Sequence, residues 1–243
     1  MKFSVEFLEE CPSTNAWLYG LAHAPEGQVI VARNQTAGRG QRGNSWESEP
    51  GQNLTFSLLL RPENLIASRQ FELSMVVSIA IAEAIGHFLP RENRPEIKWP
   101  NDIYVGNKKI CGILIQHSLK GPGIDRSVVG VGINVNQEVF LSDAPNPASI
   151  VHFNGMRHLD INAVLDDVLS QISTYYDEYC KCPDRDMLYE SYHSMLWRRN
   201  GCWPFQSSDG AIFEASIESV TPSGMLELSN GYSYAFKEVS FVL

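Results

Sequence analysis

The residues from 33 to 46 carry the clearest chemical signal in the sequence, because this segment (RNQTAGRGQRGNSW) alternates glycines with arginines inside an acidic chain. The residues concerned are Gly38, Arg39, Gly40, Arg42 and Gly43. Glycines allow a backbone to approach a ligand closely, and guanidinium groups bind carboxylates and phosphates through paired hydrogen bonds. The segment therefore predicts a binding site for an anion.

The same glycines match the dinucleotide fingerprint G-x-G-x-x-G, which requires a helix directly after its last glycine. Residues 28–32 are typical of a buried strand, but the segment after Gly43 is polar and contains Pro50 and Gly51. Residues 53–60 alternate as a second strand. A loop between two strands argues against the fingerprint, and the Gly-Lys-Ser/Thr of a phosphate-binding P-loop is also missing.

Two further segments combine polar groups with apolar strands. Residues 97–104 read IKWPNDIY, where Lys98, Asn101 and Asp102 would be costly to bury without partners. Lys109 precedes an apolar run that contains Gly112, so its ammonium could reach a ligand there. A plain turn and a solvated hairpin with a surface lysine explain these residues about as well on spacing alone.

A third segment, residues 128–136, reads VVGVGINVN. Gly130 and Gly132 permit close approach of a ligand or another backbone. Asn134 and Asn136 offer amides at the end of the strand, although turn formation accounts for them nearly as well.

The elements that must position these groups follow from periodicity. A strand with Phe3, Val5 and Phe7 is followed by a helix through about Ala24 whose Trp17, Leu18 and Leu21 are expected to face inward. Further helices are predicted at 68–89, 161–179 and 186–196. Four strands are predicted at 97–99, 103–105, 110–119 and 128–135, in an antiparallel arrangement. From Gly201, short strands and turns predict a separate small β-domain.

Composition limits the function classes. The chain has 243 residues and a net charge of −9, which argues against a dedicated nucleic-acid surface. The first residues lack the apolar core of a signal peptide, and no stretch reaches 18 apolar residues. We therefore expect a soluble, cytoplasmic protein.

The five cysteines form no paired C-x-x-C spacing, which favours reduced thiols over a disulfide framework or a regular zinc site. The weaker alternative is a metal site formed by Cys180, Cys182, His193 and Cys202.

Taken in order, five motifs resemble those of the biotin protein ligases, also called holocarboxylase synthetases. They are STN at 13–15, QTAGRGQRG at 35–43, KWPND at 98–102, KICGIL at 109–114 and GVGIN at 130–134. The resemblance implies an α+β catalytic domain of the class II aminoacyl-tRNA synthetase and biotinyl/lipoyl transferase type over residues 1–200, with a mixed sheet flanked by helices. It implies an SH3-like barrel over residues 201–243.

The resemblance also implies the activity. Biotin would attack the α-phosphate of MgATP to give biotinyl-5′-AMP, and a lysine of a biotin carboxyl carrier domain would then accept the biotin. The implied catalytic residues are Arg39, Arg42, Asp102 and Lys109. The implied biotin-binding residues are Ser13, Thr14, Asn15, Gln35, Gly38, Arg39, Gly40, Gln41, Lys109, Gly112 and Gly130. The implied ATP- and adenylate-binding residues are Arg39, Arg42, Trp46, Asn101, Lys109 and Asn134.

Other implications concern partners. The STN motif begins at residue 13, which leaves no room for the N-terminal DNA-binding domain of some relatives, so we expect no direct DNA binding and no membrane association. The magnesium of MgATP would be held mainly by phosphates and water, with no protein metal site. Homodimer formation stays open. Gln41 stands where many relatives have arginine, and the missing charge is expected to weaken retention of the adenylate.

Two rival functions stay open. A lipoate or octanoate transferase of the same fold would need a long apolar slot for the acyl chain, and STN with KWPND favours biotin. A non-catalytic biotin or nucleotide sensor could keep the pocket, but Asp102 together with the cations favours an enzyme.

Overall fold

The computed structural model describes residues 1–41, 44–142 and 144–242. A seven-stranded mixed sheet forms the larger part of the molecule, in the order β1-β2-β3-β7-β6-β5-β4. Its strands are β1 Ser4–Cys11, β2 Gln28–Gln35, β3 Leu54–Leu60, β4 Pro95–Lys98, β5 Asp102–Val105, β6 Lys108–Lys120 and β7 Gly123–Ile133. Strands β1 and β2 are parallel and every other neighbouring pair is antiparallel.

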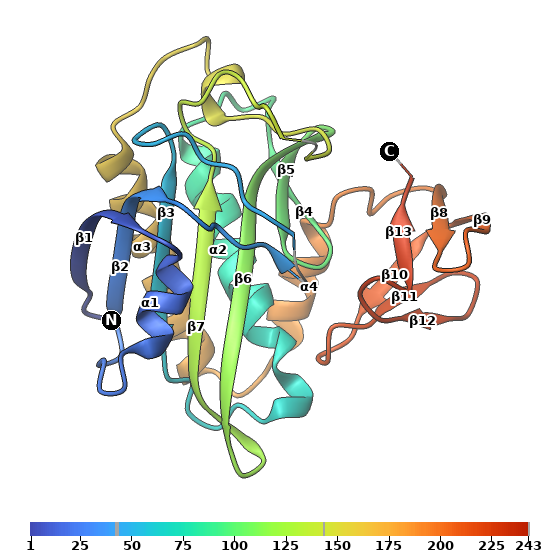
Figure 1. Ribbon diagram of the computed structural model, residues 1–243. Coiled ribbons are helices and arrows are strands. Elements are labelled where there is room, and N and C mark those ends of the chain that lie inside the picture. The colour runs from blue at the N-terminus through green and yellow to red at the C-terminus, as the bar shows by residue number, and fades with distance from the viewer. Residues whose placement is uncertain (42–43, 143, 243) are drawn as a thin grey trace.

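Helices cover the sheet on both faces (Figure 1). α2 (Phe71–His87) and α3 (Ile161–Lys181) pack together on one face, and the short α1 (Thr14–Gly20) lies on the other face over β2, β3 and β7. α4 (Asp186–Ser194) packs on α2, and short 3-10 helices span Ala67–Arg69 and Ile150–His152. No helix within the described residues is long and apolar enough to cross a membrane.

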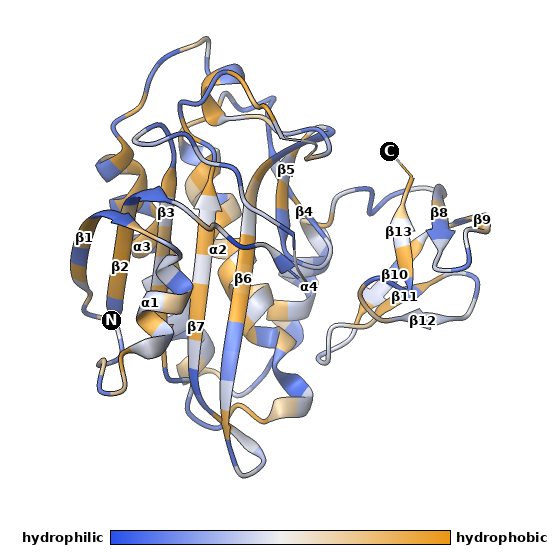
Figure 2. Ribbon diagram, viewed as in Figure 1, coloured by the Kyte–Doolittle hydropathy of each residue, from blue (hydrophilic) through white to orange (hydrophobic). Residues whose placement is uncertain are grey.

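The burial of β3 fits its place inside the sheet. Every residue of β3 is buried, and β3 lies in the middle of the sheet between β2 and β7. Figure 2 shows mainly hydrophobic residues along β2 and β3. Strands covered on both faces need such continuous apolar runs.

The C-terminal strands form two small sheets beside the main sheet (Figure 1). They are ordered β10-β11-β12 and β13-β8-β9, with β8 Trp203–Ser207, β9 Ile212–Ala215, β10 Ile217–Val220, β11 Leu226–Leu228, β12 Ser233–Tyr234 and β13 Val239–Phe241. The Trp99 indole donates a hydrogen bond of 3.1 Å to the Gly224 carbonyl, which joins the two parts. The predicted α+β class, with a helix-flanked mixed sheet and a small C-terminal β region, is confirmed. The boundary between residues 200 and 201 stays a prediction.

The first helix differs from its prediction. α1 ends at Gly20 rather than near Ala24, and only Leu18 of its three expected inward residues is buried. Trp17 and Leu21 are 43% and 37% exposed. Seven residues make two turns, so α1 presents one narrow face to the sheet.

Candidate functional site

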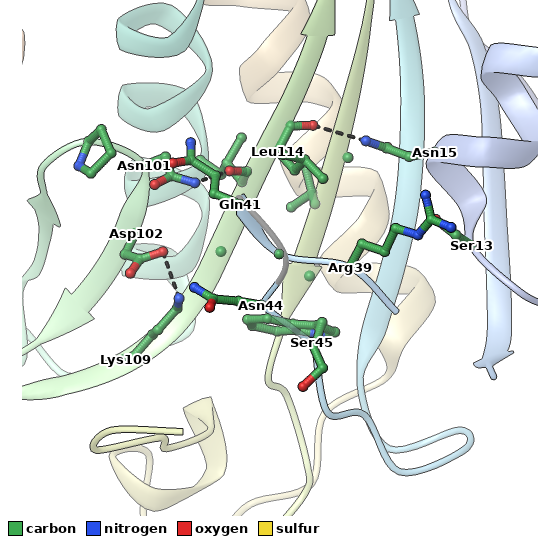
Figure 3. A pocket seen from close by; sticks show the side chains of 18 of the residues that line it. Ser13, Asn15, Arg39, Gln41, Asn44, Ser45, Asn101, Asp102, Lys109 and Leu114 are labelled. Atoms are coloured by element: carbon green, nitrogen blue, oxygen red, sulfur yellow. Dashed lines mark hydrogen bonds and ion pairs between the residues drawn. The ribbon is translucent and has the colours of Figure 1, made fainter. Parts of the chain in front are cut away.

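A pocket lies on the α1 face of the sheet, between α1, the loop after β2, the first half of β6, the C-terminal end of β7, and the turn between β4 and β5. It gathers most of the residues that the sequence singles out. The predicted residues that line it are Ser13, Thr14, Asn15, Gln35, Arg39, Gly40, Gln41, Trp46, Asn101, Asp102, Lys109, Gly112 and Gly130. Figure 3 shows Ser13 and Asn15 on one side of the pocket and Asp102 and Lys109 on the other.

Uncharged groups at the start of α1 form one end of the pocket. Ser13 is the N-cap of α1, and the Thr14 backbone N–H donates 2.8 Å to the Gln35 side-chain oxygen. The Asn15 amide donates 3.1 Å to the Leu114 carbonyl, and its Oδ1 accepts 2.6 Å from the Ser57 hydroxyl. This end is therefore held in one arrangement by four elements: α1, β2, β3 and β6.

Glycines of β6 and β7 leave room for other side chains at the sheet surface of the pocket. A Cβ at Gly130 would lie 2.1 Å from Asn15 Oδ1, and a Cβ at Gly132 would lie 2.4 Å from the Trp46 ring. A Cβ at Gly112 would lie 3.0 Å from the same ring. Side chains therefore occupy the space that the glycines of β6 and β7 leave open.

The glycine-rich loop after β2 folds back on itself and joins β2 to β3, as the sequence predicts. The Gly40 N–H donates 2.7 Å to the Asn44 carbonyl, and the Trp46 N–H donates 3.1 Å to the Gly38 carbonyl. Gly38 lies outside the pocket lining, but a Cβ there would lie 2.7 Å from the Trp46 carbonyl. The loop thus forms a narrow hairpin over the sheet, with Arg39 exposed on it.

Arg42 and Gly43 belong to the predicted anion-binding segment. Both lie outside the described residues. The role of Arg42 in catalysis and in adenylate binding therefore stays a prediction.

Trp46 lies at the base of the loop with its ring over the glycines of β6 and β7. Its Nε1 is buried and has no hydrogen-bond partner among the described residues. A buried N–H without an acceptor costs free energy. The indole therefore offers an unused donor and a flat apolar surface inside the pocket.

Opposite charges lie at the other end of the pocket. Lys109 Nζ lies 2.7 Å from Asp102 Oδ1, and the two side chains are only 25% and 20% exposed. Lys109 Nζ also lies 5.7 Å from the centre of the Trp46 ring, within the range of a cation–π contact. The two residues therefore line the same pocket and are bound to each other.

The two asparagines expected on the adenine side differ. Asn101 lines the pocket, and its side-chain amide donates to the Ile113 carbonyl. The backbone carbonyl of Asn101 accepts a hydrogen bond of 3.0 Å from the Ile113 N–H. Asn134 is buried and does not line the pocket; its amide donates 3.0 Å to the Ala148 carbonyl. Its Oδ1 has no partner among the described residues. Contact of Asn134 with adenine stays a prediction.

Three residues that the sequence reasoning did not assign to the site contribute to it. Ser57 is fully buried and holds Asn15, and a serine in the middle of an apolar strand was the signal for it. Lys98 lines the pocket near Asp102, in a motif that was already singled out. Phe236 lines it from the C-terminal part, and no sequence pattern connects it to the rest.

Comparison with known proteins assigns the chain to a family. Residues 7–134, more than half of the chain, match the Biotin/lipoate A/B protein ligase family. Biotin--[acetyl-CoA-carboxylase] ligase of Paracoccus denitrificans is 37% identical over 145 residues, covering 59% of this chain and 57% of that protein. Bifunctional ligase/repressor BirA of Bacillus subtilis is 36% identical over 128 residues, covering 52% of this chain and 38% of that protein. The matches thus span about two fifths to three fifths of these relatives.

Solved structures extend the likeness to the whole chain. The biotin protein ligase of Aquifex aeolicus in complex with biotin and ATP superposes with a TM-score of 0.78 and 26% identity, covering 97% of both chains. The helix-flanked sheet and the small C-terminal sheets therefore form a biotin protein ligase fold. The chain belongs to the Biotin/lipoate A/B protein ligase family.

Proposed function

We propose that the protein is an ATP-dependent ligase that activates biotin as biotinyl-5′-AMP and transfers it to a lysine of a biotin carboxyl carrier domain. The observation that carries this proposal is the pocket itself, which has uncharged donors and acceptors at one end and the Lys109–Asp102 pair at the other. Its likeness over 97% of the chain to a ligase in complex with biotin and ATP supports the same reading.

The uncharged end suits the ureido ring of biotin. The ring is neutral, so it needs fixed hydrogen-bond partners rather than an ion pair. The Ser57 hydroxyl contacts Thr14 and Asn15, and the Asn15 amide donates to the Leu114 carbonyl. Gln35 is held by the Thr14 N–H, so these groups are fixed before the ligand arrives. Preorganisation of this kind reduces the entropy lost on binding.

The cationic side chains of the pocket suit the first chemical step, with Arg39 near Ser13 and Lys109 on the opposite side (Figure 3). The biotin carboxylate attacks the α-phosphorus, a carboxyl oxygen–phosphorus bond forms, and the bond to the β-phosphate oxygen breaks. Two anions must meet, so Arg39, Arg42 and Lys109 would offset their repulsion and stabilise the charge that develops on the phosphoryl oxygens. Trp46 would cover the adenylate from the loop above.

The magnesium ion of MgATP would supply further charge neutralisation. The described residues contain no group of three or more His, Cys, Asp or Glu side chains that could hold a metal. We expect the ion to be held mainly by phosphates and water, which is how proteins commonly bind magnesium with nucleotides.

In the second step the acceptor lysine attacks the activated carbonyl. Its amine must be neutral to react, although the reference pKa of lysine is about 10.4. Asp102 lies beside Lys109, and its carboxylate would orient that amine and receive its proton. The new amide bond forms, the bond between the carbonyl carbon and the bridging oxygen breaks, and AMP leaves with that oxygen.

A reconstituted transfer assay tests this function. The purified protein receives ATP, a biotin carrier domain, and either biotin or lipoate. We expect pyrophosphate release and a carrier mass gain of one biotinyl group with biotin only. Reaction with lipoate instead would identify a lipoate ligase, and ligand binding without either product would identify a sensor.

A further inference from the structure

Lys98 belongs to the main sheet, lines the pocket and contacts the C-terminal part of the chain. It is the last residue of β4 and pairs in register with Asp102, the first residue of β5. Its Nζ lies 5.1 Å from the ring centre of Tyr104 in β5 and 5.5 Å from that of Phe241 in β13. The side chain also lines the pocket.

The Lys98 ammonium has no anion of its own. Within the described residues no carboxylate lies within 4.0 Å of it and no hydrogen bond leaves its Nζ, while the Asp102 carboxylate is taken by Lys109 at 2.7 Å. The two aromatic rings attract the cation but leave its three donors without strong acceptors. Burial lowers the pKa of Lys98, Asp102 opposes this, and Lys109 and Arg198 add to it. An anion that binds here would therefore stabilise the charged form of Lys98.

We propose that Lys98 binds the pyrophosphate portion of ATP and holds it as the leaving group of the first step. This inference rests on the function proposed above. It gives Lys98 a task separate from that of Lys109, which would contact the biotin carboxylate and the α-phosphate.

The layout of the pocket supports this assignment. Ser13 and Asn15 lie on the side opposite Asp102 (Figure 3), and Lys98 is the strand partner of Asp102. In phosphoryl chemistry the attacking and leaving oxygens are roughly in line across the phosphorus. A carboxylate that enters from the Asn15 side therefore sends the leaving group toward the Asp102 side. When the bond between the α-phosphorus and the bridging oxygen breaks, the electron pair goes to pyrophosphate, and a nearby ammonium stabilises that charge.

A purely structural role is the alternative. Lys98 could serve only to connect β5 with β13 through its two aromatic contacts. Such a role would affect both chemical steps alike, because it would loosen the pocket as a whole. The two roles therefore differ in which step depends on the charge.

Lys98→Met removes the charge and keeps most of the apolar stem, and Lys108→Met removes a charge from an exposed residue of the nearby strand β6. Each variant is assayed for biotin-dependent pyrophosphate release against ATP concentration, and separately for transfer from preformed biotinyl-5′-AMP to a carrier domain. We expect Lys98→Met to lose roughly 30- to 1000-fold in kcat/KM for ATP and to retain transfer within about threefold. Lys98→Arg should recover part of the loss, and Lys108→Met should match the wild type in both assays.

Equal losses in both steps, or unchanged pyrophosphate release, would overturn the proposal. A measurement on the wild-type protein keeps it testable if Lys98→Met does not fold. Inorganic pyrophosphate should shield Lys98 from reductive methylation, read by mass spectrometry, while Lys108 stays reactive. An unshielded Lys98 would overturn the assignment, whereas a shielded Lys98 in a protein that makes no biotinyl-5′-AMP would refute only the proposed ligase reaction.

Discussion

At the scale of single residues, the pair of Lys109 and Asp102 links the two proposed steps. Their 2.7 Å contact means that each charge is balanced by the other before any ligand arrives. A carboxylate or phosphate that binds Lys109 would compete with Asp102 for its ammonium and would weaken this contact. On the proposed mechanism, binding of the first substrates would thereby make Asp102 available to the acceptor amine of the second step.

Substitutions of the two residues should therefore slow different steps of the reaction. Lys109→Ala should slow adenylate formation by roughly 100- to 1000-fold, since it removes a cation from the developing negative charge. Asp102→Asn should slow transfer from preformed biotinyl-5′-AMP more than it slows adenylate formation. Single-turnover assays of each step measure both effects, with Lys108→Ala as the control. Near-normal pyrophosphate release by Lys109→Ala would refute the role given to Lys109.

Gly130 should be intolerant of any side chain. A Cβ there would meet Asn15 Oδ1 at 2.1 Å, and Asn15 is held by Ser57 and Leu114. Overpacking of this kind costs about 1–3 kcal/mol, so Gly130→Ala should weaken biotin binding by roughly 5- to 150-fold in titration calorimetry. Gly20→Ala is the control, because no atom lies within 4 Å of its added Cβ. Equal biotin affinities for the two variants would contradict this account of the pocket floor.

At the scale of elements, α1 and β3 act as one unit. α1 has only seven residues, and isolated helices of that length are not stable. Its first turn is fixed to the sheet through Thr14 and Asn15, both of which contact the Ser57 hydroxyl at 2.8 and 2.6 Å. One buried hydroxyl of the sheet therefore helps to fix the proposed biotin end of the pocket.

Ser57→Ala tests this dependence. Loss of the hydroxyl leaves Asn15 Oδ1 without a partner, which costs about 1–3 kcal/mol, and biotin affinity should fall by roughly 5- to 150-fold. Ser78→Ala is the matched control, because Ser78 is equally buried, lies on α2 and has no hydrogen-bond partner among the described residues. Calorimetry with biotin gives the affinities. A similar loss in both variants would mean that Ser57 acts only through general stability.

The hairpin of β6 and β7 should make the fold sensitive to acid. Burial lowers the pKa of His117, whose Nδ1 lies 2.8 Å from the Ser127 hydroxyl. Below the unfolded pKa of about 6.5, the unfolded chain takes up a proton that the folded chain does not. The stabilisation is therefore complete above that pH and is lost as the pH falls toward the lower folded pKa.

His117→Gln should show a smaller decrease of the free energy of unfolding between pH 7.5 and 5.5, measured by urea denaturation. The exposed His23→Gln serves as the control. His193, whose pKa burial also lowers, should leave part of the acid dependence in place. An unchanged pH dependence in His117→Gln would show that the hairpin does not contribute to it.

At the scale of the whole molecule, the C-terminal sheets complete the pocket. Trp99, beside the proposed phosphate end, donates to Gly224 and packs edge-on against Phe236 at 6.2 Å between ring centres. Phe236 lines the pocket itself. The wall near Asp102 is therefore built from both parts of the chain, whereas the residues of the proposed biotin end come from the larger part.

Phe236→Ala should therefore weaken the binding of ATP without weakening that of biotin. Its loss opens the wall near Trp99, so KM for ATP should rise by roughly tenfold, as expected for about 1.4 kcal/mol of lost contact, while biotin affinity stays unchanged. Tyr232→Ala removes an exposed aromatic ring from the same part of the molecule and is the control. Loss of biotin affinity in Phe236→Ala would show that the C-terminal part supports the whole pocket rather than one end.

Local patterns predicted most of the elements in this fold. The apolar run at residues 54–60 and the helical spacing at residues 71–87 are properties of neighbouring residues, so the chain shows them without its tertiary contacts. The same is true of the glycine-rich loop, whose connection of two strands follows from Pro50 and Gly51 and the strand after them. The exposure of Trp17 was not predictable in this way, because it depends on how little of α1 the sheet covers.

The sequence by itself determined the identity of the chemical groups and the order of the elements that carry them, because residue type and periodicity are local. Only the tertiary structure decided which groups meet. It bound Lys109 to Asp102, tied Asn15 to Ser57 across 42 positions of sequence, and brought Phe236 to the wall near Trp99. These contacts arise from burial and strand register between distant segments, where a shift of one residue would turn every side chain to the opposite face.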